Sequence, residues 1–564
     1  MPFGDVYIEV DVSGLRSFKP ERRKNMFSFA ATLVALYACS SSLQWTPASA
    51  ANILAVQTIP GKSHWNVMRS MLRALTDRGH TLTVFTPFVD GDRDGYTEVD
   101  VSEKIAPNLG INATFLIENY IPLRKAMPSM INHSRKRCDM IYGHPRMVDI
   151  LNRAAAWHFD LVVTEPFMSE CVAYVANVLG VPMVHVVAFP VVTYSERPLT
   201  GHVPNLAAAG HAMSRRGTPK TFAERFGNVA LMVYCSALTW YTEWKLRRSN
   251  PRPYDAMDLV RPSMIFINSH SITIPARSQT SDFVQIGGIH LTPPEPIPKV
   301  IYRTRSVATL GGLGIVTPKY YTEDILEFID DAPHGVIFLS FGSMILMSSL
   351  PETVQLAFKD ALARVPQKVL WKYEEKMKEI PDNVMSRKWF PQRDILLHTN
   401  VKLFISHGGI SGVYESLDAA VPVLGFPIYH DQHRNIENLV NAGMAIGMDL
   451  LSVTEGTLLN AISEIVNNDR YQKNAKIASE RFKDRPMSPA ESVVYWTEYV
   501  LRHKGAPHLK SHALNLTWYQ YFLVNVISTF LFIAFVVLFI IYYGLRVIRS
   551  HICTFFHSVN TKSK

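Results

Sequence analysis

WFPQRDILLHTNVKLFISHGGISGVYESLDAAVPVLGFPIYHDQ, residues 389–432, is the stretch that decides the fold. Within it, residues 401–405 form a short apolar run that is typical of a buried strand. Residues 406–409, SHGG, follow as a tight loop, and residues 411–420 predict a helix. A second apolar run at 423–426 predicts the next strand. Strand, glycine loop, helix and strand in this order indicate an α/β fold with a parallel sheet.

The loop between the first strand and the helix is suited to binding an anion. Backbone N–H groups converge there, and the start of a helix contributes the equivalent of about half a positive charge. His407 adds a further hydrogen bond, so we expect a diphosphate at this loop. Glu415 lies just over one turn into the helix. An ionised carboxylate only accepts hydrogen bonds, which suits a pair of ribose hydroxyls.

Three further side chains of the segment are candidates for binding a ligand. Trp389 offers a flat face on which a base can stack, a contact worth roughly 1–3 kcal/mol per base. Asp431 and Gln432 follow the second strand, and open α/β sheets bind ligands beyond the carboxyl ends of their strands. We expect these two side chains to bind the sugar hydroxyls, Asp431 as acceptor and Gln432 as donor and acceptor.

The segment resembles, at nearly every motif position, the nucleotide-sugar signature of the UDP-glycosyltransferase family. The positions that carry the match are Trp389, Gln392, His407, Gly408, Gly409, Glu415, Pro422, Pro427, Asp431 and Gln432. The resemblance implies that UDP-sugar is bound by Ser343, Trp389, Gln392, Ser406, His407, Gly408, Gly409, Ser411, Gly412, Glu415, Asp431 and Gln432. Many relatives carry Asn where this chain has Ser411, and Ser still caps a helix.

The resemblance extends beyond this segment. Residues 61–65, GKSHW, are similar to the catalytic loop of the family, and residues 341–344, FGSM, to its donor loop. Residues 159–165, 221–225 and 331–335 match less specifically, and many relatives carry Asp in place of Glu165. The resemblance implies the GT-B fold, in which an N-terminal domain binds the acceptor and a C-terminal domain binds the nucleotide sugar.

Two similar halves are also visible in the residue pattern itself. The first half predicts a strand, a helix and a strand at 52–57, 65–78 and 81–85, and the second at 336–340, 351–364 and 368–371. This repetition predicts an α/β protein with two doubly wound parallel sheets that face a cleft. The predicted parts are an extension with signal peptide (1–50), an acceptor domain (51–290), a linker with an insertion (291–322), a donor domain (323–500), a juxtamembrane segment (501–520), a transmembrane helix (521–543) and a tail (544–564).

Glycosyl transfer needs a base for the acceptor hydroxyl, and His64 is the candidate. A histidine with a pKa near 6.5 is suited to this task, and a positioned base contributes roughly 10²–10⁴-fold. A carboxylate should orient it. Glu165 and Asp160 lie at opposite ends of the strand predicted at 161–164, about 16 Å apart. Glu165 is at the ligand end, so we assign it this role. Attack opposite the leaving UDP predicts inversion.

Both ends of the chain contain targeting signals. A basic cluster at 22–24, an apolar run at 27–39 and Ala48-Ser49-Ala50 form a secretory signal, with Met26 as the better start. Residues 521–543 match one bilayer in length, with aromatic belts at both ends. The signal places the body in the lumen, where the sequons at Asn112 and Asn132 predict glycans. The resemblance implies the endoplasmic reticulum membrane as the location.

Composition narrows the remaining properties. The net charge of +9 is spread out, so nucleic acid is not the expected partner. Among the five cysteines, Cys138, Cys171 and Cys235 remain in the predicted body, where one disulfide is possible and its pairing is open. No Asp-x-Asp metal motif is visible, so we expect no metal, and we expect no cofactor besides the UDP-sugar co-substrate. A homo- or hetero-oligomer is compatible with the sequence.

Several alternatives stay open at this stage. The Asp-Gln-His-Arg-Asn run at 431–435 resembles invertebrate relatives that use UDP-glucose, so glucose is the favoured sugar and a small lipophilic hydroxyl compound the expected acceptor. UDP-glucuronic acid is the alternative donor, with Arg434 or His433 as the cation for its carboxylate. A membrane-anchored binding protein without catalysis and a hydrolase are the other classes. Residues 300–318 read as an exposed loop whose deletion should leave activity intact.

Overall fold

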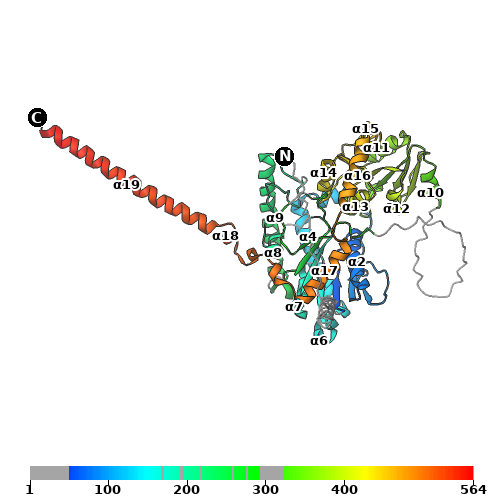
Figure 1. Cartoon of the computed structure of the whole chain (residues 1–564), viewed down its shortest axis with the longest axis horizontal. Coiled ribbons are helices and arrows are strands. Elements are labelled where there is room, and N and C mark those ends of the chain that lie inside the picture. The colour runs from blue at the N-terminus through cyan, green and yellow to red at the C-terminus, as the bar shows by residue number, and fades with distance from the viewer. Residues whose placement is uncertain are drawn as a thin grey trace, which may run out of the picture. The chain divides into compact units, whose positions relative to one another are not determined.

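The computed structural model describes residues 50–562 except 167–169, 191–195, 215–216, 257–259, 275–276 and 292–322. The predicted signal peptide, nearly all of the predicted linker and the insertion at 300–318 therefore lie outside the described residues. The described body contains two parallel sheets, each covered by helices on both faces (Figure 1). This is the predicted α/β architecture.

The first sheet has the strand order β3-β2-β1-β5-β6-β7-β8, and every pairing in it is parallel. Its strands are β1 (Asn52–Val56), β2 (Thr81–Thr86), β3 (Tyr96–Asp100), β5 (Leu161–Thr164), β6 (Met183–Val187), β7 (Met264–Ile267) and β8 (Phe283–Gln285). The order reverses at β1 and β5, whose carboxyl ends lead to His64, in the first turn of α2, and to Glu165. In such sheets this reversal is where ligands bind.

The helices of the first half are α2 (Lys62–Asp77), α3 (Ala113–Tyr120), α4 (Leu123–Tyr142), α5 (Pro145–Asn152), α6 (Ala154–Trp157), α7 (Ala173–Leu179), α8 (Glu196–Thr200) and α9 (Phe222–Ser249). The predicted helix 65–78 begins earlier than expected, at Lys62. The reason is that Trp65 N–H bonds to the Gly61 carbonyl and closes the first turn there. Trp65, Met68, Met71 and Leu72 bury the apolar face of α2 against the sheet.

The second sheet has the order β12-β11-β9-β13-β14-β15 and is also parallel throughout. Its strands are β9 (Val336–Ser340), β11 (Lys368–Lys372), β12 (Val384–Arg387), β13 (Val401–Ser406), β14 (Val423–Gly425) and β15 (Ala445–Gly447). Its helices are α10 (Glu323–Asp330), α11 (Glu352–Ala363), α12 (Gln392–Leu397), α13 (Ile410–Asp418), α14 (Gln432–Asn441), α15 (Glu455–Asn467) and α16 (Asp469–Lys483).

The two halves are joined by more than the linker. Helix α17 (Pro489–Arg502) follows the second sheet in sequence but packs against α2, with Val493 and Val500 in the core of the first half. Strands β4 (Ile111–Asn112) and β10 (Ile345–Leu346), one from each half, pair in parallel. The predicted donor domain, 323–500, thus includes a helix that belongs to the core of the acceptor half.

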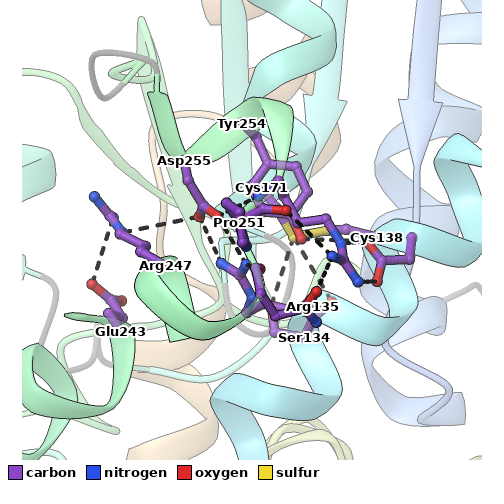
Figure 2. A network of polar contacts seen from close by, with 12 residues as sticks. Ser134, Arg135, Cys138, Cys171, Glu243, Arg247, Pro251, Tyr254 and Asp255 are labelled. Carbon is purple, nitrogen blue, oxygen red and sulfur yellow. Dashed lines mark hydrogen bonds and ion pairs between the residues drawn. A yellow bond between two sulfur atoms is a disulfide. The ribbon is translucent and has the colours of Figure 1, made fainter. Parts of the chain in front are cut away.

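A disulfide and two ion pairs, Arg135–Asp255 and Arg252–Asp139, fix α4 (Figure 2). Cys138 of α4 is bonded to Cys171 in the short helix Glu170–Val172, while Cys235 is free and buried. Arg135 donates to both carboxylate oxygens of Asp255, at 2.6 and 2.8 Å. The disulfide therefore ties α4, which lines the acceptor side of the cavity described below, to the segment that follows Glu165.

After α17 the chain passes through α18 (Trp518–Tyr521) into α19 (Val524–Lys562). Among the described residues, α19 is the helix that is long and apolar enough to cross a membrane, over Val524–Phe555, and its most apolar window of 18 residues has a mean hydropathy of 2.8. The apolar stretch begins later than predicted, because the Tyr521 hydroxyl accepts a hydrogen bond from Val203 N–H and packs on the first half. The helix itself continues beyond the predicted end at residue 543, to Lys562.

Candidate active site

A cavity of about 650 Å³ lies between the carboxyl ends of the two sheets. Its lining comes from both halves, so that His64 and the residues around it face residues that follow β9, β12, β13 and β14. Most of the predicted site residues line this cavity. They are His64, Ser343, Trp389, Gln392, Ser406, His407, Gly409, Ser411, Gly412, Glu415, Asp431 and Gln432.

On the wall formed by the first half, His64 and Glu165 are in direct contact. His64 Nδ1 lies 2.7 Å from Glu165 Oε1, and the carboxylate is 1% exposed. His64 was expected in a loop, but it occupies the first turn of α2, which holds it more rigidly. Gln57 and the backbone N–H of Ala188 each lie 3.4 Å from the Glu165 carboxylate, which fixes the carboxylate in turn.

The charge of Glu165 sets the proton affinity of His64. Burial lowers the pKa of His64, but the charge of Glu165 and its hydrogen bond raise it by more, so that the pKa is above its ordinary value. Asp160 cannot take this part, because its carboxylate accepts from Asn52 N–H, 2.8 Å away, at the opposite end of the strands. The geometry thus pairs the imidazole with the carboxylate at the ligand end of β5.

On the opposite wall, the glycines around His407 leave room for its ring. A Cβ at Gly342, whose φ is +72°, would lie 2.8 Å from His407 Cε1, and one at Gly409 would lie 2.5 Å from Nε2. Burial lowers the pKa of His407 to about 4, so the ring is neutral at neutral pH. Ser406 Oγ accepts from Gly408 N–H at 3.2 Å and shapes the same turn.

Two polar atoms beside this turn point to a ligand. His407 Nδ1 and Ser411 Oγ are buried, and neither has a hydrogen-bond partner among the described residues. Leaving a buried polar group unpaired costs about 1–3 kcal/mol. Helix α13 also begins here, and Gly409 supplies no side-chain cap. Unpaired donors at an uncapped helix start are the arrangement that an anionic ligand would complete.

Next to the start of α13 lies the predicted nucleoside end of the site. Trp389 is 49% exposed at the cavity, which leaves a face of its ring open for stacking. Gln392 Nε2 donates to Glu415 Oε2, and Gly412 leaves space for this pair, since a Cβ there would lie 3.3 Å from Gln392 Nε2. Burial raises the pKa of Glu415 to about 7, against the opposing effect of Gln392.

Asp431 and Gln432 lie where the loop after β14 enters α14. Burial favours the neutral form of Asp431, but His430 and a 2.7 Å hydrogen bond from Asn435 outweigh it and lower its pKa. Gln432 Oε1 accepts from the backbone N–H groups of Ile428 and Tyr429, at 2.9 and 3.1 Å. Its acceptor atom is therefore engaged with the loop, and in this arrangement Gln432 has only its Nε2 amide to offer a sugar.

Arg434 does not line the cavity. It is buried, and its guanidinium donates to the backbone carbonyl of His211 in the first half, while His433 does line the cavity. Arg434 was one of the two cations considered for a sugar carboxylate. In the structure its side chain instead joins the two halves.

The sequence reasoning missed several residues at the cavity. Lys372, at the end of β11, is almost fully buried beside the donor loop and pairs with Glu374 at 2.8 Å. The sequence did offer a signal for Lys372, because this residue directly follows the strand predicted at 368–371. The donor loop itself is held by the first half, because Gly110 N–H bonds to the Ser343 carbonyl at 3.1 Å. Apolar side chains of α3 and α4, among them Leu116, Met127 and Met130, line the acceptor side.

Metal ligands do not cluster in the described part of the chain. No group of three or more His, Cys, Asp or Glu side chains that could hold a metal ion occurs there. Contrary to the expectation, two overlapping Asp-x-Asp sequences do occur, at Asp90/Asp92 and Asp92/Asp94, but Asp90 is ion-paired with Arg69 at 2.8 Å.

The predicted glycosylation sites differ in their surroundings. Asn112 is exposed, and its side-chain oxygen caps α3 by accepting from Phe115 N–H at 3.1 Å. Asn132 lies inside α4 and is partly buried.

The chain is similar to known proteins over most of its length. Residues 53–554 match the family described as UDP-glucoronosyl and UDP-glucosyl transferase. UDP-glucosyltransferase 2 of Dactylopius coccus is 35% identical, over 88% of this chain and 92% of its own length. UDP-glucuronosyltransferase 1-2 of Rattus norvegicus is 28% identical, over 86% and 90%. The Arabidopsis thaliana UGT89C1 structure with quercetin has a TM-score of 0.51 at 14% identity, over 80% of this chain and 100% of its own. Such structures have the GT-B fold, which confirms the predicted fold class.

Proposed function

Since this chain belongs to the family of UDP-glucoronosyl and UDP-glucosyl transferases, we propose that it transfers glucose from UDP-glucose to a hydroxyl of a small lipophilic acceptor, with inversion. One observation carries the proposal. His64, which is paired with a buried carboxylate 2.7 Å away, and a glycine loop with unpaired buried polar atoms line the same cavity.

His64 acts as the base in this mechanism. Its Nε2 takes the proton of the acceptor hydroxyl while the oxygen attacks the anomeric carbon and the bond to the UDP oxygen breaks. The Glu165 carboxylate orients the ring through Nδ1 and stabilises the imidazolium that forms. The loop at His407 and the start of α13 stabilise the negative charge that develops on the departing diphosphate. Attack from the face opposite UDP gives inversion.

The position of Arg434 supports glucose as the sugar. A glucuronate carboxylate near Asp431 brings two negative charges within a few ångströms, which is unfavourable unless a cation lies between them. Arg434, the permanent cation of this run, is instead bonded to the His211 carbonyl. The 35% identical relative also carries the name of a glucosyltransferase, and the 28% identical one that of a glucuronosyltransferase.

The donor is tested by a side-by-side assay of UDP-glucose and UDP-glucuronic acid with one phenolic acceptor and the full-length protein in microsomes. We expect a higher kcat/KM for UDP-glucose. Faster transfer from the glucuronic donor would overturn the choice of sugar.

We extend the proposal to the place of the protein in the cell. Helix α19 supports a single-pass anchor, and the signal sequence supports a body in the lumen of the endoplasmic reticulum. Protease added to sealed microsomes should then remove only the C-terminal tail, and Asn112 and Asn132 should carry glycans that endoglycosidase removes. A mature protein that begins at Met1 or Met26 would contradict this topology.

A further inference from the structure

Helix α9 has its apolar face turned outward. Its buried residues include the small or polar side chains Asn228, Cys235, Thr239 and Thr242. The exposed side chains include Phe222 (76% exposed), Phe226, Val229, Val233, Trp240 (66% exposed) and Trp244, which we call the α9 stripe. Amphipathic helices of soluble proteins normally bury their large apolar residues, so this helix has the opposite polarity.

The α9 stripe is continuous along the helix. Its members follow one another at spacings of four, three, four, seven and four residues, which places all six in a sector of roughly 60° at 3.6 residues per turn. From Phe222 to Trp244 the stripe extends for about 33 Å at 1.5 Å per residue. Trp240 and Trp244 stack on each other at 6.4 Å. A continuous patch of this kind marks an interaction surface.

The structure connects α9 to the start of the apolar helix α19. Asn228, on the buried side of α9, bonds to the backbone of Leu206, Ala209 and His211. The chain just before these residues contacts the juxtamembrane segment: His202 bonds to Ser511 and Arg197 to the Leu516 carbonyl. One segment of the first half thus holds both α9 and the chain that leads into α19.

Cations lie at both ends of the α9 stripe. Lys220 and Arg225 are at its beginning, and Lys245, Arg247 and Arg248 are at its end, where Arg247 also pairs with Glu243 at 3.7 Å (Figure 2). Tryptophan beside lysine and arginine is typical of helices that lie in the headgroup region of a bilayer, where the cations meet lipid phosphates. A second copy packed on the same stripe would bring these cations together, which disfavours self-association.

We propose that the α9 stripe is inserted into the headgroup region of the phospholipid bilayer that α19 crosses. This proposal rests on the membrane anchor proposed above. Helix α9 packs against α4, which supplies Met127 and Met130 to the acceptor side of the cavity. The docked helix therefore places the acceptor side of the cavity next to the membrane, where lipophilic acceptors are concentrated.

The test is spin labelling of the full-length protein in vesicles of phosphatidylcholine and phosphatidylserine. Single cysteines replace Val229 or Val233 in a Cys553→Ser background, which removes the exposed free thiol. Leu356→Cys, an exposed apolar position on α11, is the matched control, and Ala534→Cys on α19 is the reference for lipid. The ratio of collision rates with oxygen and with a water-soluble nickel chelate is measured at each label.

We expect the ratio at Val229 and Val233 to be several-fold higher than at Leu356 and to approach that at Ala534. A ratio equal to that at Leu356, with Ala534 in lipid, overturns the docking of α9 and leaves the anchor intact. Low collision rates with both reagents at Val229 and Val233 overturn it in favour of a protein partner. A water-exposed label at Ala534 overturns the anchor and the docking together.

Discussion

Replacing Glu165 with Gln tests the role of the carboxylate while keeping the shape of the side chain. The substitution removes the negative charge that lies 2.7 Å from His64 Nδ1, in a position that is 1% exposed. In the transition state His64 becomes a cation, so the lost interaction is a charge-assisted hydrogen bond. Such a bond contributes about 3 kcal/mol when shielded from water, which corresponds to a loss in kcat of about 10²-fold.

The pH profile gives a second, independent readout of the same substitution. The base must be neutral, so kcat/KM rises as the pH passes the pKa of His64. Glu165 raises that pKa, whereas burial opposes it and remains in the variant. The acid limb of the profile should therefore move to lower pH in Glu165→Gln, while the plateau falls.

The assay is the initial rate of transfer from labelled UDP-glucose, and Asp160→Asn is its control. Asp160 accepts a hydrogen bond from Asn52 at the far end of the strands, so we expect less than about a threefold change in kcat from the loss of this contact. A larger loss of kcat in Asp160→Asn than in Glu165→Gln would refute the orientation of the sheet toward the substrate. An unshifted acid limb in Glu165→Gln would refute the coupling to His64.

Three further predictions concern the donor side and the insertion. In Gln432→Ala the KM for UDP-glucose should rise about tenfold, because one hydrogen bond to the sugar is lost together with the hydrogen bonds that hold Ile428 and Tyr429. The Kd for UDP, measured by calorimetry, should change little. An unchanged KM would contradict the role of Gln432. Since the pKa of Glu415 is about 7 and its ionised form binds ribose, UDP-glucose affinity should fall about tenfold from pH 8 to pH 6, and this dependence should vanish in Glu415→Gln. Deletion of residues 300–318 should leave expression and kcat/KM intact, and loss of folded protein in a thermal melt would count against it.

The apolar runs made the sheets predictable. The strands predicted at 161–164 and 336–340 match β5 and β9 residue for residue, because each run is fully buried and bounded by polar or turn residues. The start of α2 was less predictable from sequence. The pattern places the helix at 65–78, yet it begins at Lys62 behind Gly61, a cap without a side chain and therefore without a residue-type signal.

The site was predictable as a set of residues but not as a set of contacts. Family spacing named His64, Glu165 and the donor loop, and each lies at or beside the cavity. The sequence pattern does not show which partner each residue contacts. Arg434 donates to the backbone carbonyl of His211, and the backbone N–H of Gly110 bonds to the donor loop. Such contacts join residues far apart in sequence through backbone atoms, which leave no mark on residue type.

The most direct test of the central claim, that His64 is the base of a UDP-sugar transferase, compares transfer and binding in one variant. His64→Ala is assayed with labelled UDP-glucose and a phenolic acceptor, and UDP binding to the same preparation is measured by calorimetry. We expect transfer to be abolished and the Kd for UDP to stay within a few-fold of the wild type, because the predicted diphosphate loop lies on the other half. Transfer near the wild-type rate, or a loss of UDP binding that accounts for the lost activity, would contradict it.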